Sequence, residues 1–475
     1  MNTHYAVNSS ENNIRESSFT SNLNNKHQDA HCDTETNAHA SKVHRPSIWA
    51  ESVKLFKRRF VMMFIFALCS AMNGVPQFMY TVIADVIACH YDTSLDSVNW
   101  TSETFMVAFL PLVFPVMLLM DKKGLKITLI IGALLNFAGS LFQCFSFEPD
   151  RFVYVLGASS FYAIAQVFLL SLPPIIAGVW FGTAEVGLAC AMGVFGNQLG
   201  IALGFIIPPF VIENNCTDDV NISYELSIIT YPIAVINGVI LLLTIFVFQG
   251  KPDKFPSIAQ ATKEVNADYL SSLKQLVTDR SFMFLFMAYG FIVGTYLAMS
   301  TLMNEMVLIH FPGEEVDAGW LGAIMVFAGM GGSILFGVFL DKTHRFKEVS
   351  VVIFGLSAIC MLCYTFMIRM EHIWIQFLFF SILGVLMTGY IPVGFDFGAE
   401  ITYPIPEAMS GSLLNASTMV FSIILTNVAS SLIQSYGDFV SNLFLTVCIL
   451  VGLVFVVFMK CELKRTTASN EEKQT

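Results

Sequence analysis

Twelve apolar runs, each long enough to cross a membrane, account for most of this sequence. A helix needs about 20 apolar residues to cross the roughly 30 Å hydrocarbon core of a bilayer. Hydrophobic residues make up 55% of the sequence and charged residues only 13%. The mean hydropathy of +0.66 excludes an ordinary soluble domain. We therefore predict an all-α membrane protein with twelve transmembrane helices, near residues 60–86, 100–120, 126–147, 152–180, 185–212, 227–249, 281–306, 318–340, 349–368, 373–398, 408–433 and 439–459.

A short charged motif occurs twice, each time at the end of an apolar run. The first copy is Asp121-Lys122-Lys123-Gly124-Leu125-Lys126, and the second, about 220 residues later, is Asp341-Lys342-Thr343-His344-Arg345. Nearly the same distance separates Pro173-Pro174 from Pro392, and the start of the first run from the start of the seventh. The second six helices therefore repeat the first six. This predicts two pseudo-symmetric six-helix bundles.

Polar stretches set the expected domain boundaries. Residues 1–58 are rich in Asn, Ser, Thr and His, which predicts a disordered N-terminal tail and no cleavable signal peptide. The two bundles are expected at 59–249 and 281–460, and a C-terminal tail at 461–475. Apolar residues recur every three or four positions in the connecting segment 250–280, which predicts an amphipathic helix on the inner membrane surface: Tyr269, Leu270, Leu273, Leu276 and Val277.

The distribution of positive charge predicts the orientation in the membrane. Cytoplasmic loops retain Lys and Arg, and all 25 of these residues except Arg151 and Arg369 lie on the side of the two termini. Both termini are therefore expected in the cytoplasm, and we expect a multi-pass protein of the plasma membrane. The loop between the fifth and sixth helices then lies outside, so its Asn-x-Thr/Ser sequons at Asn215 and Asn221 are candidate glycosylation sites.

The repeated motif is also a candidate gate. A carboxylate at the inner end of a helix, such as Asp121 or Asp341, is stabilised when it lies beside the N-terminus of a neighbouring helix, whose exposed N–H groups attract negative charge. The basic residues that follow, Lys122, Lys126 and Arg345, are expected to bridge to Glu185 or Glu407 at the inner ends of other helices. Such contacts would latch the cytoplasmic side. The alternative is that the motif acts only as a determinant of topology.

Polar residues near the bilayer centre carry no charge at neutral pH. A proton-coupled transporter usually has a titratable group in its pathway, so this composition favours a facilitator. Because no Lys or Arg lies near the bilayer centre, an organic anion there would lose its hydration without gaining a basic partner. Amide oxygens and tyrosine faces, by contrast, can hold a cation. The candidate ligand-binding residues are Asn73, Gln77, Gln166, Asn197, Gln198, Tyr289 and Tyr296. Each amide has the alternative role of bonding neighbouring helices, although the glycines beside Gln198 would leave room for a ligand.

Several longer strings resemble one family of membrane proteins. Two six-helix bundles with a charged motif after the second helix of each are similar to the major facilitator superfamily, whose halves rock around a central site. The following strings resemble, within it, the feline leukaemia virus subgroup C receptor family: Val179-Trp180-Phe181-Gly182, Val194-Phe195-Gly196-Asn197-Gln198-Leu199-Gly200, Gly313-Glu314-Glu315-Val316, Met387-Thr388-Gly389-Tyr390, Glu400-Ile401-Thr402-Tyr403-Pro404 and Leu413-Leu414-Asn415-Ala416-Ser417. That resemblance implies transport of choline and ethanolamine, or export of haem.

The same resemblance assigns positions in the cavity. Gln198 resembles the family's cavity glutamine and Tyr296 its cavity tyrosine, with Tyr289 as the substitute if the register of the seventh helix differs. Two positions depart from the family. Gln77 stands where choline-handling members carry tryptophan, and Met419 where they carry glutamine. These departures weaken choline as the specific substrate without excluding it.

We expect a uniporter of a small organic cation or amino alcohol, working by alternating access as a monomer in the lipid bilayer. The alternatives are a haem transporter and a membrane receptor or scaffold that transports nothing. All nine histidines lie in the tail and loops, and the ten cysteines show no disulfide or zinc pattern. We therefore expect no metal, no cofactor, no catalytic residue, no enzymatic activity and no nucleic-acid partner.

Overall fold

The computed structural model describes residues 56–182, 185–213, 219–252, 269–370, 372–405, 407–464 and 466–467. Side chains are described for all of these except residues 121, 186, 219–220, 269–271, 341 and 408. Most of the predicted tail 1–58 and the candidate sequon at Asn215 therefore lie outside the described residues, as do the side chains of Asp121 and Asp341. Helices make up most of the described part, as predicted, and no strand occurs within it.

The first half of the chain forms six membrane-length helical segments. Their bounds are α2 Arg58–Phe78 with η1 Thr81–Ile83 and α3 Ala84–His90, α4 Leu95–Lys123, α5 Leu125–Gln143, α6 Phe152–Leu170 with α7 Pro173–Trp180, α8 Val186–Val211 and α9 Asp219–Phe246. The first and fourth segments are interrupted. Proline explains the second interruption, because Pro173 begins α7 and supplies no backbone N–H to continue α6.

The second half repeats this plan after the short helix α11 Tyr269–Thr278. Its elements are α12 Arg280–Thr301 with α13 Met303–Leu308, α14 Glu315–Thr343, α15 Phe346–Met367, α16 Ile373–Leu383 with the π-turn η2 Gly384–Thr388 and α17 Tyr390–Thr402, α18 Glu407–Tyr436 and α19 Asp438–Phe458. Again the first and fourth segments are the interrupted ones. The interruptions therefore obey the pseudo-symmetry that the repeated motif predicts.

Twelve of these helical segments, within the described ranges, are long and apolar enough to cross a membrane. They confirm the twelve predicted spans, which differ only at their ends. The largest difference is in the sixth span, which begins at Asn221 and not near residue 227. Polar residues there are accommodated within the helix, because the Asn221 amide donates a 2.8 Å hydrogen bond to Glu225 one turn later.

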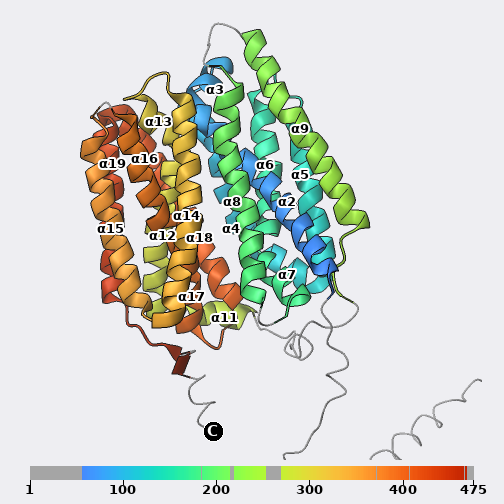
Figure 1. The fold of residues 1–475 in the computed structure, drawn as a ribbon, viewed down its shortest axis with the longest axis vertical. Helices are drawn as coiled ribbons and strands as arrows, with labels where there is room; N and C mark the ends of the chain where they lie inside the picture. Colours follow the sequence, from blue (N-terminus) through green and yellow to red (C-terminus); the bar gives the residue numbers. More distant parts are fainter. Residues whose placement is uncertain are drawn as a thin grey trace, which may run out of the picture. The chain divides into compact units, whose positions relative to one another are not determined.

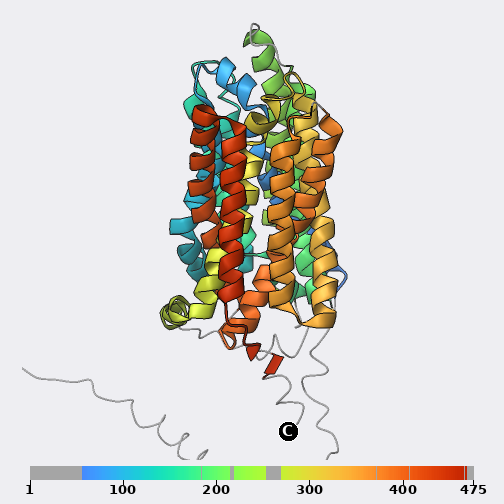
Figure 2. The ribbon, with the colours of Figure 1, turned by 90° about the vertical axis from the view of Figure 1, so that its left-hand side faces the viewer.

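The spans run side by side, with α3 and α13 at one end and α7, α11 and α17 at the other (Figure 1). The second end carries Lys57, Arg58, Lys122 and Lys123, and we call it the basic end; the opposite end is the far end. Helix α11 lies across the bundle axis at the basic end, where Figure 2 shows it end-on. That position is the one expected of an amphipathic helix at a membrane surface.

Close packing of two helices organises each half. In the first half, Gly196, Gly200 and Gly204 of α8 lie against the backbone of α2, and a Cβ atom at Gly200 would collide with the carbonyl of Ala71. In the second half, Gly290 of α12 lies against the side chains of Ser417 and Phe421 of α18. Small residues spaced by four positions allow transmembrane helices to approach in this way. The first and fifth helices of each half are thereby fixed against one another.

Candidate functional site

Side chains of the two halves meet at the far end. Asn99 of α4 donates a 2.7 Å hydrogen bond to Glu305 of α13. One turn along α4, the hydroxyls of Ser102 and Thr301 share a hydrogen bond of 3.2 Å. Asn304 reaches from α13 to the first segment, donating to Asp85 at 2.9 Å and to the carbonyl of Val82 at 3.0 Å. These bonds join segments that lie about 200 residues apart in the sequence.

Helix α18 contributes a second set of bonds to α4. Ser430 and Gln434 both donate to Asp96, at 2.9 and 3.0 Å, and Asn427 donates to Glu103 at 2.7 Å. We call the residues of the two sets the far-end gate: Asp85, Asp96, Asn99, Ser102, Glu103, Thr301, Asn304, Glu305, Asn427, Ser430 and Gln434. These hydrogen bonds all lie at the far end of the bundle and join one half to the other.

The far-end gate is acidic and its donors are neutral. Asp85, Asp96, Glu103 and Glu305 accept from amides and hydroxyls, and none of them forms an ion pair with a lysine or arginine of the described ranges. Glu305 lies beyond the span Arg280–Thr301 and is 6% exposed. Burial raises the pKa of its carboxyl, and the nearby charge of Asp96 adds to the rise, while the hydrogen bond from Asn99 opposes it.

The two halves separate toward the basic end along α8. Phe205 is fully buried and lies against Gly319 and Gly322 of α14. Val194 lies on the same line of α8, three turns toward the basic end, and is 44% exposed. Helix α8 is therefore covered by α14 at the far end and partly exposed on this face toward the basic end. The two halves are thus closed against one another at the far end, as in one state of a transporter that alternates access.

At the basic end, the observed partner of Glu185 differs from the predicted one. Glu185 pairs with Arg59 at 2.8 Å, inside the first half, and the Arg59 guanidinium also lies over the rings of Phe60 and Phe181. Lys122 is exposed, Lys126 is half-buried and Arg345 is exposed. Glu407 begins α18 and has an interaction partner of its own. The latch through Asp121 and Asp341 stays a prediction, because neither side chain is described.

Two predicted amides hold the first half together. Asn73 is fully buried and donates to Asn136 at 2.8 Å and to the carbonyl of Tyr162 at 2.9 Å. Asn197 donates to the carbonyl of Ser70 at 3.2 Å. These bonds tie α2 to α5, α6 and α8. They support the interpretation of both residues as bonds between helices.

Gln77 and Gln166 form a pair at the two interrupted segments of the first half. The Gln166 amide donates to Gln77 Oε1 at 2.9 Å, and both side chains are buried. Gln166 Oε1 is buried without a hydrogen-bond partner. Buried polar atoms are nearly always satisfied, so an unsatisfied acceptor beside Gln77 is suited to a donor from a ligand.

The second half offers an unsatisfied hydroxyl at the matching place. Tyr296 is 2% exposed, and its hydroxyl makes no hydrogen bond of standard geometry to a described residue, with the hydroxyls of Thr388 and Ser300 as its nearest polar neighbours. Thr388, in the π-turn of the other interrupted segment, lies close to it and is also unsatisfied. Tyr289 differs, because it donates to the carbonyl of Ile391 at 3.4 Å and packs against aromatic rings. Of these two tyrosines, Tyr296 is therefore the one whose hydroxyl has bonding capacity left for a ligand.

Gln198 and Met419 complete the candidate residues. Gln198 is half-buried on the line of α8 between Val194 and Phe205, and no bond to a described residue is found for its amide. Met419 is 8% exposed in α18. The expectation that glycines beside Gln198 make room for a ligand is wrong. Gly196 and Gly200 are covered by the backbone of α2, so their small size serves helix packing.

The far-end gate could not be predicted from the sequence. Its carboxylates could be placed only at the ends of spans, and pairs such as Asn427 with Glu103 are 324 residues apart. The absence of basic residues from the sequence around these carboxylates was the available signal. It did not identify the partners.

Comparison with known proteins defines the class. The family model described as Major Facilitator Superfamily matches residues 66–423, and the chain belongs to that superfamily of membrane transporters. The chain is 39% identical to the choline/ethanolamine transporter flvcr2a of Danio rerio over 88% of its own length and 90% of that protein. It is 38% identical to the choline/ethanolamine transporter FLVCR2 of Rattus norvegicus, over 89% and 78% of the two chains. Within the superfamily it therefore belongs to the family of the FLVCR transporters.

Solved structures agree on the fold. A bacterial homologue of the human lysosomal transporter Spinster superposes with a TM-score of 0.68 at 13% identity, covering 85% of this chain and 97% of that one. The D-xylose–proton symporter superposes with a TM-score of 0.66 at 12% identity, over 85% and 98%. These likenesses confirm the predicted architecture of two six-helix bundles.

Proposed function

We propose that this transporter carries a small organic cation or amino alcohol of the choline and ethanolamine class, as a uniporter. The observation that carries the proposal is the pair of Gln77 and Gln166, in which Gln166 Oε1 has no hydrogen-bond partner among the described residues. The hydroxyl of Tyr296 likewise makes no hydrogen bond of standard geometry to them. Neutral oxygens of this kind stabilise an ammonium or hydroxyl group without a counter-charge. The names of the relatives in fish and rat supply the substrate class.

The proposed site lies between the interrupted helices of both halves. Discontinuous helices commonly form the substrate sites of secondary transporters near the bilayer midplane. Gln77 and Gln166 would contribute from the first half, Tyr296 from the second, and Gln198 from α8 between them. Met419 would add a polarizable side chain. Asn73, Asn197 and Tyr289 would position these helices and leave contact with the ligand to the others.

The proposed orientation places the basic end in the cytoplasm, with both termini, in the plasma membrane. The far-end gate then faces outside, and the structure corresponds to an inward-facing state. We propose that the protein acts as a monomer and without catalytic chemistry. An inside-negative potential would supply roughly 2.3 kcal/mol per charge per 100 mV for inward movement of a cation, so no co-ion is needed.

A ligand screen by thermal unfolding tests the substrate class. Binding to the folded state raises apparent stability by about 2.7 kcal/mol at a hundredfold excess over Kd. We expect choline or ethanolamine to raise the Tm of the purified protein, and Gln198→Ala to abolish that rise. Gln275→Ala, an exposed glutamine on α11, is the matched control and should leave it intact. A rise with haemin alone would contradict the proposal and favour a haem transporter.

A further inference from the structure

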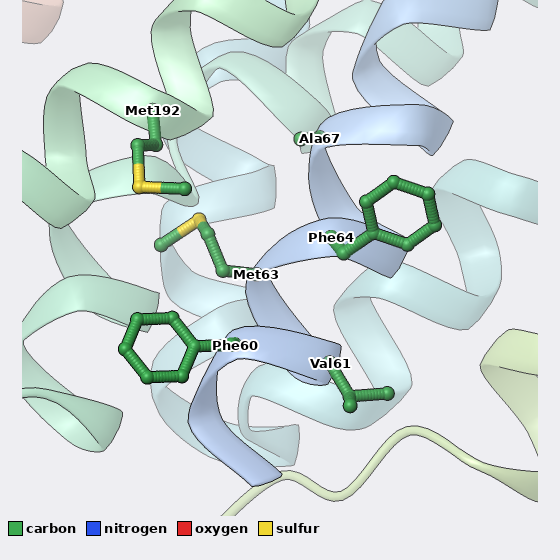
Figure 3. Close-up of a pocket in the computed structure, with 6 residues that line it drawn as sticks. All are labelled: Phe60, Val61, Met63, Phe64, Ala67 and Met192. Atoms are coloured by element: carbon green, nitrogen blue, oxygen red, sulfur yellow. The ribbon is translucent and has the colours of Figure 1, made fainter. Parts of the chain in front are cut away.

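An apolar groove lies between α2 and α8 near the basic end. Its cavity volume is about 430 Å³, within the range of small-ligand pockets. Figure 3 shows its lining, which consists entirely of apolar side chains: Phe60, Val61, Met63, Phe64, Ala67 and Met192. Phe64 is 65% exposed and Met192 41% exposed, so the groove is open along one side. Nothing in its lining resembles the amide-bearing candidate site.

The groove opens away from the proposed substrate site. Val61 and Gln77 are 16 residues apart on α2, a rotation of about 160° at 3.6 residues per turn, so they lie on opposite sides of the helix. On α8, Met192 continues a line of exposed apolar side chains with Leu199, Leu203 and Phe210. Such a line along a membrane-spanning helix faces lipid. The groove is therefore a recess in the lipid-facing surface.

Two exposed basic residues precede the groove-lining residues of α2. Lys57 precedes Phe60 and Val61 by three and four residues, which places it on the same face of α2. Lys57 and Arg58 are both exposed, and neither forms an ion pair with the described residues. Arg59 differs, because Glu185 already neutralises it. A long basic side chain at this position extends toward the membrane surface while its apolar stem stays in the bilayer.

We propose that this groove is a binding site for one anionic phospholipid, whose acyl chain lies between α2 and α8 and whose phosphate lies at Lys57 and Arg58. The inference rests on the proposed orientation, in which the basic end faces the cytoplasmic leaflet, where anionic lipids concentrate. Charge complementarity selects this occupant. A zwitterionic lipid offers the same acyl chain, but its own ammonium offsets the attraction of the phosphate.

Native mass spectrometry of the purified full-length protein tests the proposal without any transport assay. The protein is titrated with dioleoylphosphatidylglycerol or dioleoylphosphatidylcholine, and bound lipids are counted. We expect one phosphatidylglycerol to bind in preference to phosphatidylcholine. Lys57→Gln with Arg58→Gln should weaken phosphatidylglycerol about fivefold per charge removed, and Met192→Trp, which fills the recess, should weaken both lipids.

Matched variants separate this site from general lipid contact. Leu203→Trp adds the same ring on the same line of α8 outside the groove, and Lys460→Gln removes an exposed charge at the other end of the chain. Both should bind phosphatidylglycerol as the wild type does. Equal binding of the two lipids by the wild type would overturn the proposal, as would an unchanged preference in the double variant. Exclusion of both lipids by the chain's own N-terminal segment would overturn it too.

Discussion

The amide of Asn99 and the carboxylate of Glu305, 206 residues apart in the sequence, lie 2.7 Å from one another and join the two halves of the transporter. Both side chains are buried. The bond is charge-assisted if Glu305 is ionised, and it is surrounded by further carboxylates with neutral donors. The closed far end is therefore held by hydrogen bonds from amides and hydroxyls to carboxylates, and not by ion pairs among the described residues.

Asn99→Ala is expected to open the far end. Removing the amide leaves the buried Glu305 carboxylate short of a donor, which costs about 1–3 kcal/mol in the closed state only. The ratio of closed to open molecules should then fall by about 5- to 150-fold. Spin labels on the exposed Asp150 and Pro312, one in each half, would report a longer distance. The control Asn237→Ala, in α9 and outside the gate, should leave the distance unchanged, and no lengthening in Asn99→Ala would refute the role of the gate.

External acid is expected to favour the closed state. The pKa of Glu305 is raised in the closed gate, mainly because the carboxyl is buried and also because Asp96 lies near it, and it returns toward the ordinary 4.5 when the gate opens to water. The closed state therefore binds more protons, so it gains stability as pH falls through the range between the raised pKa and the ordinary one. The same spin-label distance, followed against external pH, should shorten in acid. Glu305→Gln should abolish the contribution of this carboxyl to the pH dependence, and an identical profile in that variant would rule out Glu305 as its source.

Gln77→Trp is expected to strengthen the binding of choline relative to ethanolamine. An indole face contributes about 0.5–2 kcal/mol to a quaternary ammonium, which corresponds to about 2- to 30-fold in affinity. Ethanolamine should lose affinity, because the substitution removes the amide that holds Gln166 in place. Competition between the two labelled substrates measures the ratio. An unchanged ratio in the folded variant would show that Gln77 does not contact the ligand.

Gly200→Ala is expected to lower stability by about 1–3 kcal/mol, the usual cost of overpacking. Its added methyl group would collide with the backbone carbonyl of Ala71, which cannot move without α2. Gly187→Ala is the matched control in the same helix, because a Cβ there meets no atom within 4 Å. That variant should be as stable as the wild type or slightly more stable. Equal Tm values for the two variants would show that the close packing of α2 and α8 is dispensable.

The sequence predicts the spans and their symmetry well because both depend on local chemistry. Twenty apolar residues must cross the bilayer as helix, and the proline positions near Pro173 and Pro392 mark where the fourth segment of each half is interrupted. Side-chain partners depend on three-dimensional contact. Asn73 and Gln77 are both amides of the same helix, yet one bonds Asn136 inside the bundle and the other faces the unsatisfied Gln166. Only the packed helices distinguish them.

The sequence also does not reveal what lies beside Gly196 and Gly200. A glycine in a transmembrane helix is compatible with a ligand beside it or with a second helix against it, and the sequence around Gln198 is the same in both cases. The backbone of α2 occupies the space here. The four-residue spacing from Gly196 to Gly204 was the signal that pointed to helix packing.

Electrogenic uptake into liposomes tests the central claim most directly. Purified protein is reconstituted with no sodium or proton gradient, and a potassium diffusion potential is set inside-negative. We predict that the logarithm of the accumulation ratio of labelled choline or ethanolamine rises in proportion to this potential, and that dissipating the potential abolishes the accumulation while downhill exchange continues. Uptake of neither substrate, or accumulation that requires a proton gradient and ignores the potential, would contradict uniport of an organic cation.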